Sequence, residues 1–204
     1  MPVTWREVIS PLRAVAVGKE CVANGGFETG TLDPWRPMPS EYAHYVKITG
    51  DAYEGRYCLS LRPARFGEWC GAYQLINLVW APFVLKFALK KVSPEKIEQA
   101  GCYIGDALGY TYGMYFEFEG LVDELIAFTA YLNHRTVATG TMTKDWNLIV
   151  INVRPADLDL IVNGTKIGTL PLDYRLRITQ VGLWAVALEY EGGGFLFDSV
   201  SLVA

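Results

Sequence analysis

Short apolar runs separated by turn residues make up most of the chain after residue 20. In Phe83–Lys90 the large apolar residues occupy alternate positions, so one face of the segment is expected to be buried and the other solvated. Ten runs predict strands: Ala43–Ile48, Arg56–Arg62, Cys70–Val79, Pro82–Lys91, Tyr110–Phe118, Leu125–Leu132, Trp146–Val153, Leu158–Val162, Leu176–Leu188 and Gly194–Val203. Many strands with no strand–helix alternation predict an all-β antiparallel sandwich.

Turn and helix signals refine this prediction. Asn163-Gly164 between two apolar runs predicts a tight hairpin. The segment Ser93–Gly101 predicts one small inserted helix, because Ser93 can cap it, Pro94 suits its first position and Gly101 suits its end.

The first twenty residues differ from the rest. Thr4 and Glu7 form a capping box that predicts a short helix at Trp5–Ile9, which Pro11 would stop. We interpret residues 1–20 as an arm that packs on the domain or on a neighbour, and residues 21–204 as one β-sandwich.

Charge and hydropathy narrow the choice of partners. The net charge is −4 at pH 7, with no basic stripe, which argues against nucleic acid or an anionic membrane as a partner. No apolar stretch reaches the roughly 18 residues of a membrane helix, and the start lacks the features of a secretory signal. We expect a soluble chain whose location stays open, with a virion or a cell surface among the candidates. Scarce Asn, Gln and Ser beside twelve Tyr favour a thermophilic source.

The four cysteines, Cys21, Cys58, Cys70 and Cys102, lack the paired spacing of a zinc ribbon. Buried free thiols and disulfides are the two alternatives. If Arg56–Arg62 and Cys70–Val79 are hairpin partners, Cys58 and Cys70 would face each other and form a bridge.

Two ends of the chain carry a family resemblance. Asn24-Gly25-Gly26-Phe27-Glu28-Thr29-Gly30, followed by Leu32 and Trp35, resembles the opening of carbohydrate-binding modules of the galactose-binding-like jelly-roll superfamily. Phe197–Leu202 resembles their closing strand, whereas Leu158–Leu170 is similar to a hairpin of concanavalin-like lectins. The resemblance implies a jelly roll over residues 21–204 and a non-catalytic role in glycan binding, with fold better specified than function.

The same resemblance implies a structural calcium ion, Ca2+. In the resembled modules the ion is held by a Glu of the opening motif, an Asp of the closing strand and oxygens from an intervening turn. These positions correspond to Glu28, Asp198 and Asp51 in this sequence. Calcium takes six to eight oxygen ligands, so carboxylates from distant strands suit it.

Catalytic chemistry is sparse in the sequence. Glu117 and Glu119 alternate on one strand as paired carboxylates do in jelly-roll glucanases, but a second acidic cluster is missing. We interpret both as solvated positions beside Phe116 and Phe118. No nucleophile elbow, phosphate loop or zinc motif occurs, and the two histidines, His44 and His134, are interpreted as structural. We therefore predict that the chain is not an enzyme.

Aromatic residues are the stronger candidates for function, because sugars stack their apolar faces on Trp and Tyr rings. Six residues in two groups are the predicted glycan contacts: Trp35, Tyr42 and Tyr45, then Tyr110, Tyr112 and Tyr115. Trp146 and Trp184 are interpreted as core residues. The alternative is a structural or adhesive subunit, homo-oligomeric or part of a virion appendage, capsid decoration or surface assembly, whose aromatics make subunit contacts. A jelly-roll glycoside hydrolase is a distant third.

Overall fold

A computed structural model describes residues 18–105, 111–122, 124–172, 176–189 and 193–204. Its elements are β1 (Arg36–Met38), η1 (Ser40–Tyr45), β2 (Val46–Thr49), β3 (Cys58–Leu61), β4 (Trp69–Trp80), β5 (Phe83–Lys91), β6 (Glu98–Gly105), β7 (Thr111–Val122), β8 (Leu125–Leu132), β9 (Arg135–Met142), β10 (Asn147–Val153), β11 (Asp157–Val162), β12 (Thr165–Pro171), β13 (Arg177–Ala187) and β14 (Phe195–Val203).

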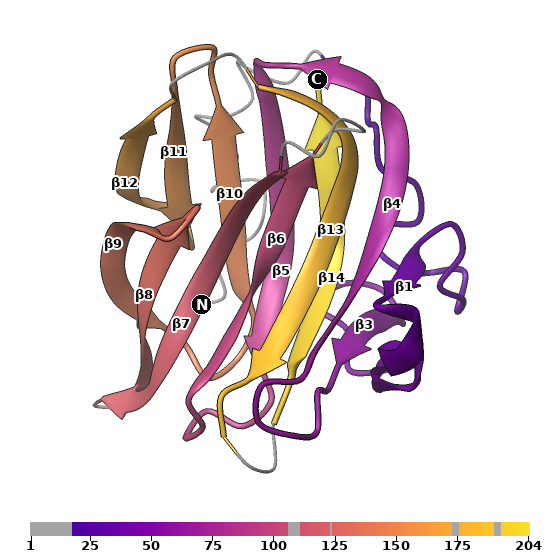
Figure 1. The fold of residues 1–204 in the computed structure, drawn as a ribbon, viewed down its shortest axis with the longest axis vertical. Helices are drawn as coiled ribbons and strands as arrows, with labels where there is room; N and C mark the ends of the chain where they lie inside the picture. Colours follow the sequence, from indigo (N-terminus) through magenta and orange to yellow (C-terminus); the bar gives the residue numbers. More distant parts are fainter. Residues whose placement is uncertain (1–17, 106–110, 123, 173–175, 190–192) are drawn as a thin grey trace.

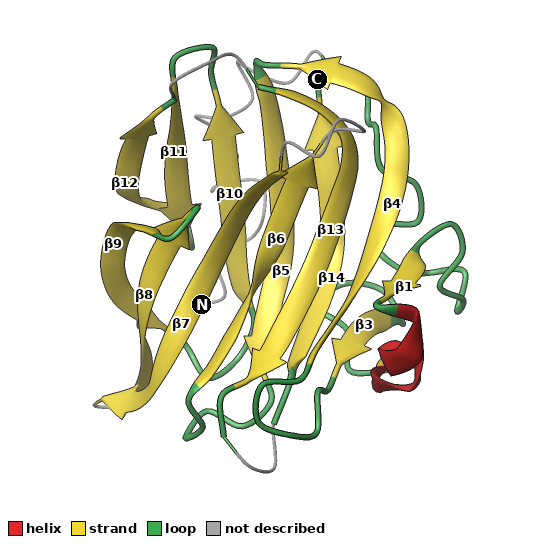
Figure 2. Ribbon diagram, viewed as in Figure 1, coloured by secondary structure: helices red, strands yellow, loops and turns green. Residues whose placement is uncertain are grey.

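The strands form two antiparallel sheets that stack as layers (Figure 1). The first sheet has the order β1-β4-β13-β6-β7-β8-β9, and the second has the order β12-β11-β10-β5-β14-β3-β2. Figure 2 shows how completely strands dominate, with the short helical segment η1 at one edge beside β1 and β3. The predicted antiparallel sandwich is confirmed.

The core lies between the sheets because inward residues alternate along each strand. In β5 the side chains of Leu85 and Phe87 are fully buried, and in β7 Phe116 and Phe118 are buried while the intervening Glu117 is partly exposed. The outward placement predicted for Glu117 and Glu119 is confirmed. The Asn163-Gly164 hairpin between β11 and β12 is also confirmed, since both residues have positive φ values of 49° and 81°.

The helix predicted at Ser93–Gly101 is wrong. Only a turn closed by the Lys96 amide on the Ser93 carbonyl occurs there, and β6 begins at Glu98. From Glu98 onward every second residue points into the core, so burial at strand period outweighs the local cap signals.

A buried ion pair explains the start of β6. Lys91 on β5 and Glu98 on β6 meet between the sheets, with 3.0 Å between Nζ and Oε2 and side chains 1% and 0% exposed. The other oxygen of Glu98 accepts the amides of Gly193 and Gly194, and Lys91 also donates to the Ser93 carbonyl. Burial lowers the pKa of Lys91, an effect that the Glu98 carboxylate opposes. This arrangement links β5, β6 and the start of β14.

The Cys58–Cys70 bridge is also wrong. Cys58 lies on β3 of the second sheet and Cys70 on β4 of the first, and both thiols are free and buried. The runs that carry them follow each other in sequence but do not pair, because β3 pairs with β2 and β14.

The predicted arm and its helix at Trp5–Ile9 fall mainly outside the described residues. At the arm's described end, Glu20 bridges to Val203 of β14, and the Lys19 amide donates to the Ala204 carbonyl at 2.8 Å. Three strands, β1, β6 and β9, were not predicted from the sequence, and β12 was predicted only as the second arm of the Asn163-Gly164 hairpin. No helix in the described residues is long and apolar enough to cross a membrane.

Candidate functional site

The outer face of the first sheet carries a line of aromatic side chains. Tyr131 on β8 is register-paired with Tyr115 on β7, Tyr115 with Gly101 on β6, and Gly101 with Trp184 on β13. Register-paired residues project from the same face of a sheet, so the three rings form one line across four strands. We call Tyr131, Tyr115 and Trp184 the aromatic row.

Ring contacts hold the aromatic row together. Tyr115 and Tyr131 stack with centroids 4.8 Å apart and planes 16° apart, and Tyr115 meets Trp184 at 5.6 Å. Gly101 stands between these last two residues. A Cβ there would lie 2.1 Å from the Met114 carbonyl oxygen, so only glycine allows this close approach of β6 to β7. Both sides of the Tyr115 ring are therefore occupied by neighbours, which leaves Trp184 and Tyr131 at the two ends of the row.

Polar groups flank the aromatic row. The Tyr115 hydroxyl lies 3.2 Å from Nδ1 of His134, and burial is the main cause that raises the pKa of Tyr115. One position further along the strands, Gln99 Nε2 donates to Glu117 at 2.8 Å. Beyond it, Thr129 donates its hydroxyl to Glu119 at 2.9 Å. Both carboxylates retain lone pairs that can accept further hydrogen bonds.

The other side of the row is bounded by Tyr103. Its hydroxyl lies 3.2 Å from the Met38 sulfur, and its ring covers Gly182, where a Cβ would be 1.9 Å from the ring. Burial, with a smaller effect from Tyr73, raises the pKa of Tyr103. Next to Tyr103 the position of Gly113 is open, since a Cβ there would meet nothing within 4 Å. The outer face thus has a bare stretch of backbone beside the rings.

Of the second predicted aromatic group, only Tyr115 can be placed in the row. Tyr110 lies outside the described residues, and for Tyr112 the structure describes only the backbone, opposite Ile104 on β6. The core interpretation of Trp184 is wrong, because it points outward between the buried Leu183 and Ala185. That alternation is the sequence signal that could have revealed it.

The residues of the first predicted aromatic group, Trp35, Tyr42 and Tyr45, lie in two different environments. Trp35 is 3% exposed, packs on Phe27 at 5.7 Å and donates its Nε1 hydrogen to the Ala23 carbonyl. No face of this ring is open to a sugar, which corrects its assignment as a glycan contact. Tyr42 and Tyr45 lie on η1, half-buried against the core with ring centroids 5.9 Å apart, and neither belongs to the aromatic row.

The three predicted calcium ligands make hydrogen bonds or ion pairs within the protein. Both oxygens of Glu28 accept the Arg56 amide, and one accepts the Tyr57 amide at 2.9 Å. These backbone bonds are the main cause that lowers the pKa of Glu28. Gly55, at φ +73°, makes room for this carboxylate, because a Cβ there would be 2.5 Å away from it.

Asp198 is fully buried and accepts the amides of Tyr53, Glu54 and Ser199. Burial raises its pKa against the lowering effect of those bonds. Asp51 points elsewhere, to Lys90 at 3.3 Å. Within the described residues no three metal-binding side chains gather. The calcium ion stays a prediction.

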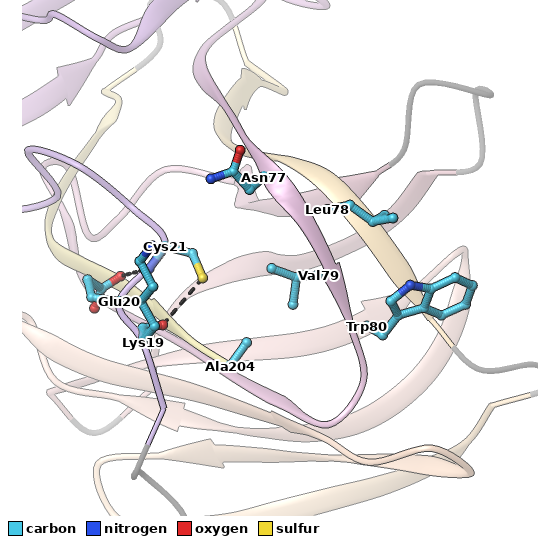
Figure 3. Close-up of a pocket in the computed structure, with 8 residues that line it drawn as sticks. All are labelled: Lys19, Glu20, Cys21, Asn77, Leu78, Val79, Trp80 and Ala204. Carbon is cyan, nitrogen blue, oxygen red and sulfur yellow. Dashed lines mark hydrogen bonds between the residues drawn. The ribbon is translucent and has the colours of Figure 1, made fainter.

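A pocket of about 470 Å³ lies at an edge of the sandwich, between the segment Lys19–Cys21 and the end of β4. Figure 3 shows its lining, with Leu78 and Trp80 on β4 and the Cys21 thiol donating to the Lys19 carbonyl at 3.3 Å. Burial is the main cause that raises the pKa of Cys21. The pocket is separate from the aromatic row, since residues 77–80 follow the part of β4 that lies beside Trp184.

Comparison with known proteins defines the fold. The sequence matches no family model and no curated protein. Among solved structures, a protein of unknown function with galectin-like fold from Bacillus subtilis is similar, with 10% identity over 93% of this chain and 98% of that one, and a TM-score of 0.63.

Two further structures carry carbohydrate functions of their own. TmCBM61 in complex with beta-1,4-galactotriose matches 90% of this chain and 97% of its own, with 15% identity and a TM-score of 0.51. SCLam, a non-specific endo-beta-1,3(4)-glucanase from family GH16, matches 97% and 98%, with 11% identity and a TM-score of 0.57. At these identities the likeness shows a jelly-roll fold, which confirms the fold-level resemblance seen in the sequence.

Proposed function

We propose that this chain is a non-catalytic glycan-binding module that holds its ligand on the aromatic row. The observation that carries the proposal is the alignment of Trp184, Tyr115 and Tyr131 on one outer face, beside the acceptor Glu117 and the donor Gln99. Aromatic surface with a few well-placed polar groups is the usual composition of a sugar site. The fold shared with TmCBM61 supports the same reading.

The geometry suggests how a sugar would lie. Tyr115 already contacts a ring on each side, so an apolar sugar face would contact mainly Trp184, while the sugar hydroxyl groups donate to Glu117 and accept from Gln99. Because the row runs across the strands, a bound oligosaccharide would run across them too.

Substitution of Trp184 tests this proposal. We expect W184A to lower affinity about five- to 150-fold for whichever oligosaccharide the parent protein binds on a glycan array, since ring contacts contribute about 1–3 kcal/mol. W146A is the matched control, because Trp146 contacts Tyr53 and immediately precedes β10 of the second sheet. Equal affinity of W184A and the parent protein in isothermal titration calorimetry would place the glycan elsewhere.

The absence of catalysis is part of the proposal and has its own test. Each of the two carboxylates on β7 is hydrogen-bonded to a neighbour, Glu117 to Gln99 and Glu119 to Thr129. We expect no turnover on a panel of chromogenic glycans. Hydrolysis that disappears in the double variant E117A/E119A would instead establish a glycosidase.

A second candidate function, a subunit of a larger assembly, is favoured by the apolar residues on β4. Leu75 and Leu78 are 62% and 54% exposed, and Leu78 lines the pocket at the sandwich edge. Exposed apolar surface of this kind is typical of subunit contacts. Light scattering after size-exclusion chromatography distinguishes the candidates: a stable oligomer that L78K dissociates, without glycan affinity, would favour the assembly.

A further inference from the structure

The carboxylates beside the aromatic row have no cationic partner. Glu117 and Glu119 alternate on β7 next to Tyr115, and their described hydrogen bonds come from neutral groups, an amide and a hydroxyl. In the described part of the chain neither forms an ion pair, whereas the acidic residues on the outside of the second sheet do. Among the described residues, no cation therefore pairs with either carboxylate.

Positions on the sheet bring this charge within range of a ligand. Residues two apart on a strand are separated by roughly 7 Å, which places the Glu117 backbone that far from Tyr115. Charges interact over about 8 Å at physiological ionic strength. An anionic group on a sugar held by the row would thus be repelled by Glu117, and more strongly at low salt.

The described cations nearest to the row are paired or placed elsewhere; Lys96, just before β6, lies 4.0 Å from Glu189. Arg36, on β1, is register-paired with Tyr73 on β4, so two strand spacings, roughly 10 Å, separate it from β13 and Trp184. Arg135 is register-paired with Leu132, whose side chain is buried in the core, and it therefore projects from the opposite face of the sheet from Tyr131. His134 is engaged by the Tyr115 hydroxyl.

We propose that the site selects neutral glycans and excludes polyuronates and other anionic polysaccharides. This inference rests on the proposed glycan function of the aromatic row. The carboxylates of Glu117 and Glu119 would favour a neutral sugar in two ways. They accept hydrogen bonds from its hydroxyl groups, and their negative charge repels a sugar carboxylate. The jelly roll itself does not decide between these ligands, whereas the charge on β7 does.

The test compares two probes on the full chain by isothermal titration calorimetry, a β-1,4-galactan oligosaccharide and an alginate oligosaccharide of similar length, in 20 mM and 200 mM salt. We expect the neutral probe to bind at least ten times more tightly at low salt, with a smaller ratio at high salt. E117Q should narrow the ratio at low salt by about threefold or more, whereas E41Q, an exposed acid on η1, should leave it unchanged.

Alginate binding as tight as galactan binding would overturn the inference while the glycan function stands. An E117Q ratio equal to that of the parent protein would also overturn it, because the selectivity would then have another origin. If neither these probes nor a glycan array gives binding that depends on Trp184, the proposed function itself fails, and this inference fails with it.

Discussion

The two sheets bury similar layers of apolar side chains but present different outer faces. On the second sheet the charges are matched. Asp159 receives Arg154 and Lys166, each at 2.7 Å, together with the Thr169 hydroxyl, and Lys90 pairs with Asp51 and Asp145. On the first sheet, stacked rings stand beside Glu117 and Glu119, for which the described residues supply no ion pair. On the second sheet the charged groups pair with one another, so few of them can still bind a ligand. The outer face of the first sheet has both aromatic surface and hydrogen-bond acceptors with free lone pairs.

The pKa of Asp159 shows how strongly the charges on the second sheet interact. The Arg154 hydrogen bond is the largest cause that holds the pKa of Asp159 well below its usual range. Such a shift stabilises the folded state above the ordinary aspartate pKa, because the charged form of Asp159 interacts more favourably in the folded chain than in the unfolded chain. The paired charges on the second sheet thus contribute to stability.

The largest effect is expected where the two sheets meet. Lys91→Met leaves Glu98 charged and buried without its cation, and removal of one partner of such a pair costs about 3–5 kcal/mol. Urea unfolding measures the loss. The control is Lys47→Met at an exposed position of β2, with an expected change within about 0.5 kcal/mol. Equal stability of the two variants would mean that the Lys91–Glu98 pair is not formed.

The next effect separates the two faces directly. Asp159→Asn should cost about 1–2 kcal/mol at pH 7, because charged hydrogen bonds to Arg154 and Lys166 are lost. Glu117→Gln should leave stability nearly unchanged, because no cation is lost.

The cost of Asp159→Asn should also depend on pH. Since the folded-state pKa of Asp159 is lowered, its contribution is present above the ordinary aspartate pKa, about 3.9, and disappears as the pH falls through the lowered value. Urea titrations at pH 7 and in acid should show the parent and variant converging. A constant difference would contradict the assigned ion pairs.

An effect of similar size concerns Asp198 and the predicted calcium ion. The resemblance to carbohydrate-binding modules predicts that a chelator lowers the thermal midpoint. Asp198→Asn should cost about 1–3 kcal/mol with or without chelator, because three backbone amides lose a charged acceptor. An unchanged midpoint in the parent protein, with no calcium in elemental analysis, would remove the ion and leave the amide donors as the stabilising groups.

The last prediction compares the reactivity of the buried cysteines with that of Cys21 at the edge pocket. Burial raises the pKa of Cys58, Cys70 and Cys102 to about 12, so these thiols should stay unmodified in the folded protein. Cys21, half-buried at the pocket, should react first with a disulfide reagent. Native labelling should therefore give one modified thiol per chain, lost in C21S, and four after unfolding. If two cysteines of the unfolded chain react only after a reductant is added, they form a disulfide and the assignment of four free thiols is wrong.

Sequence reasoning performed best where a decision depends on near neighbours. The alternation in Phe83–Lys91 placed a strand, and Asn163-Gly164 placed a hairpin, since both depend on local backbone preferences. Glu117 and Glu119 were placed outward for the same reason. The helix predicted from local capping signals at Ser93–Gly101 does not form. Burial of Glu98 against Lys91 from another strand outweighs those signals.

What the sequence by itself determined is therefore the class of fold and the face on which many side chains lie, because strand periodicity and turn chemistry act over a few residues. Only the tertiary structure decided which of these residues meet. The aromatic row depends on the register of β8, β7, β6 and β13, and β13 comes from a distant part of the chain. Trp35 is buried in the core and Trp184 lies on the outer face because of how the two sheets pack. No local sequence pattern encodes this packing.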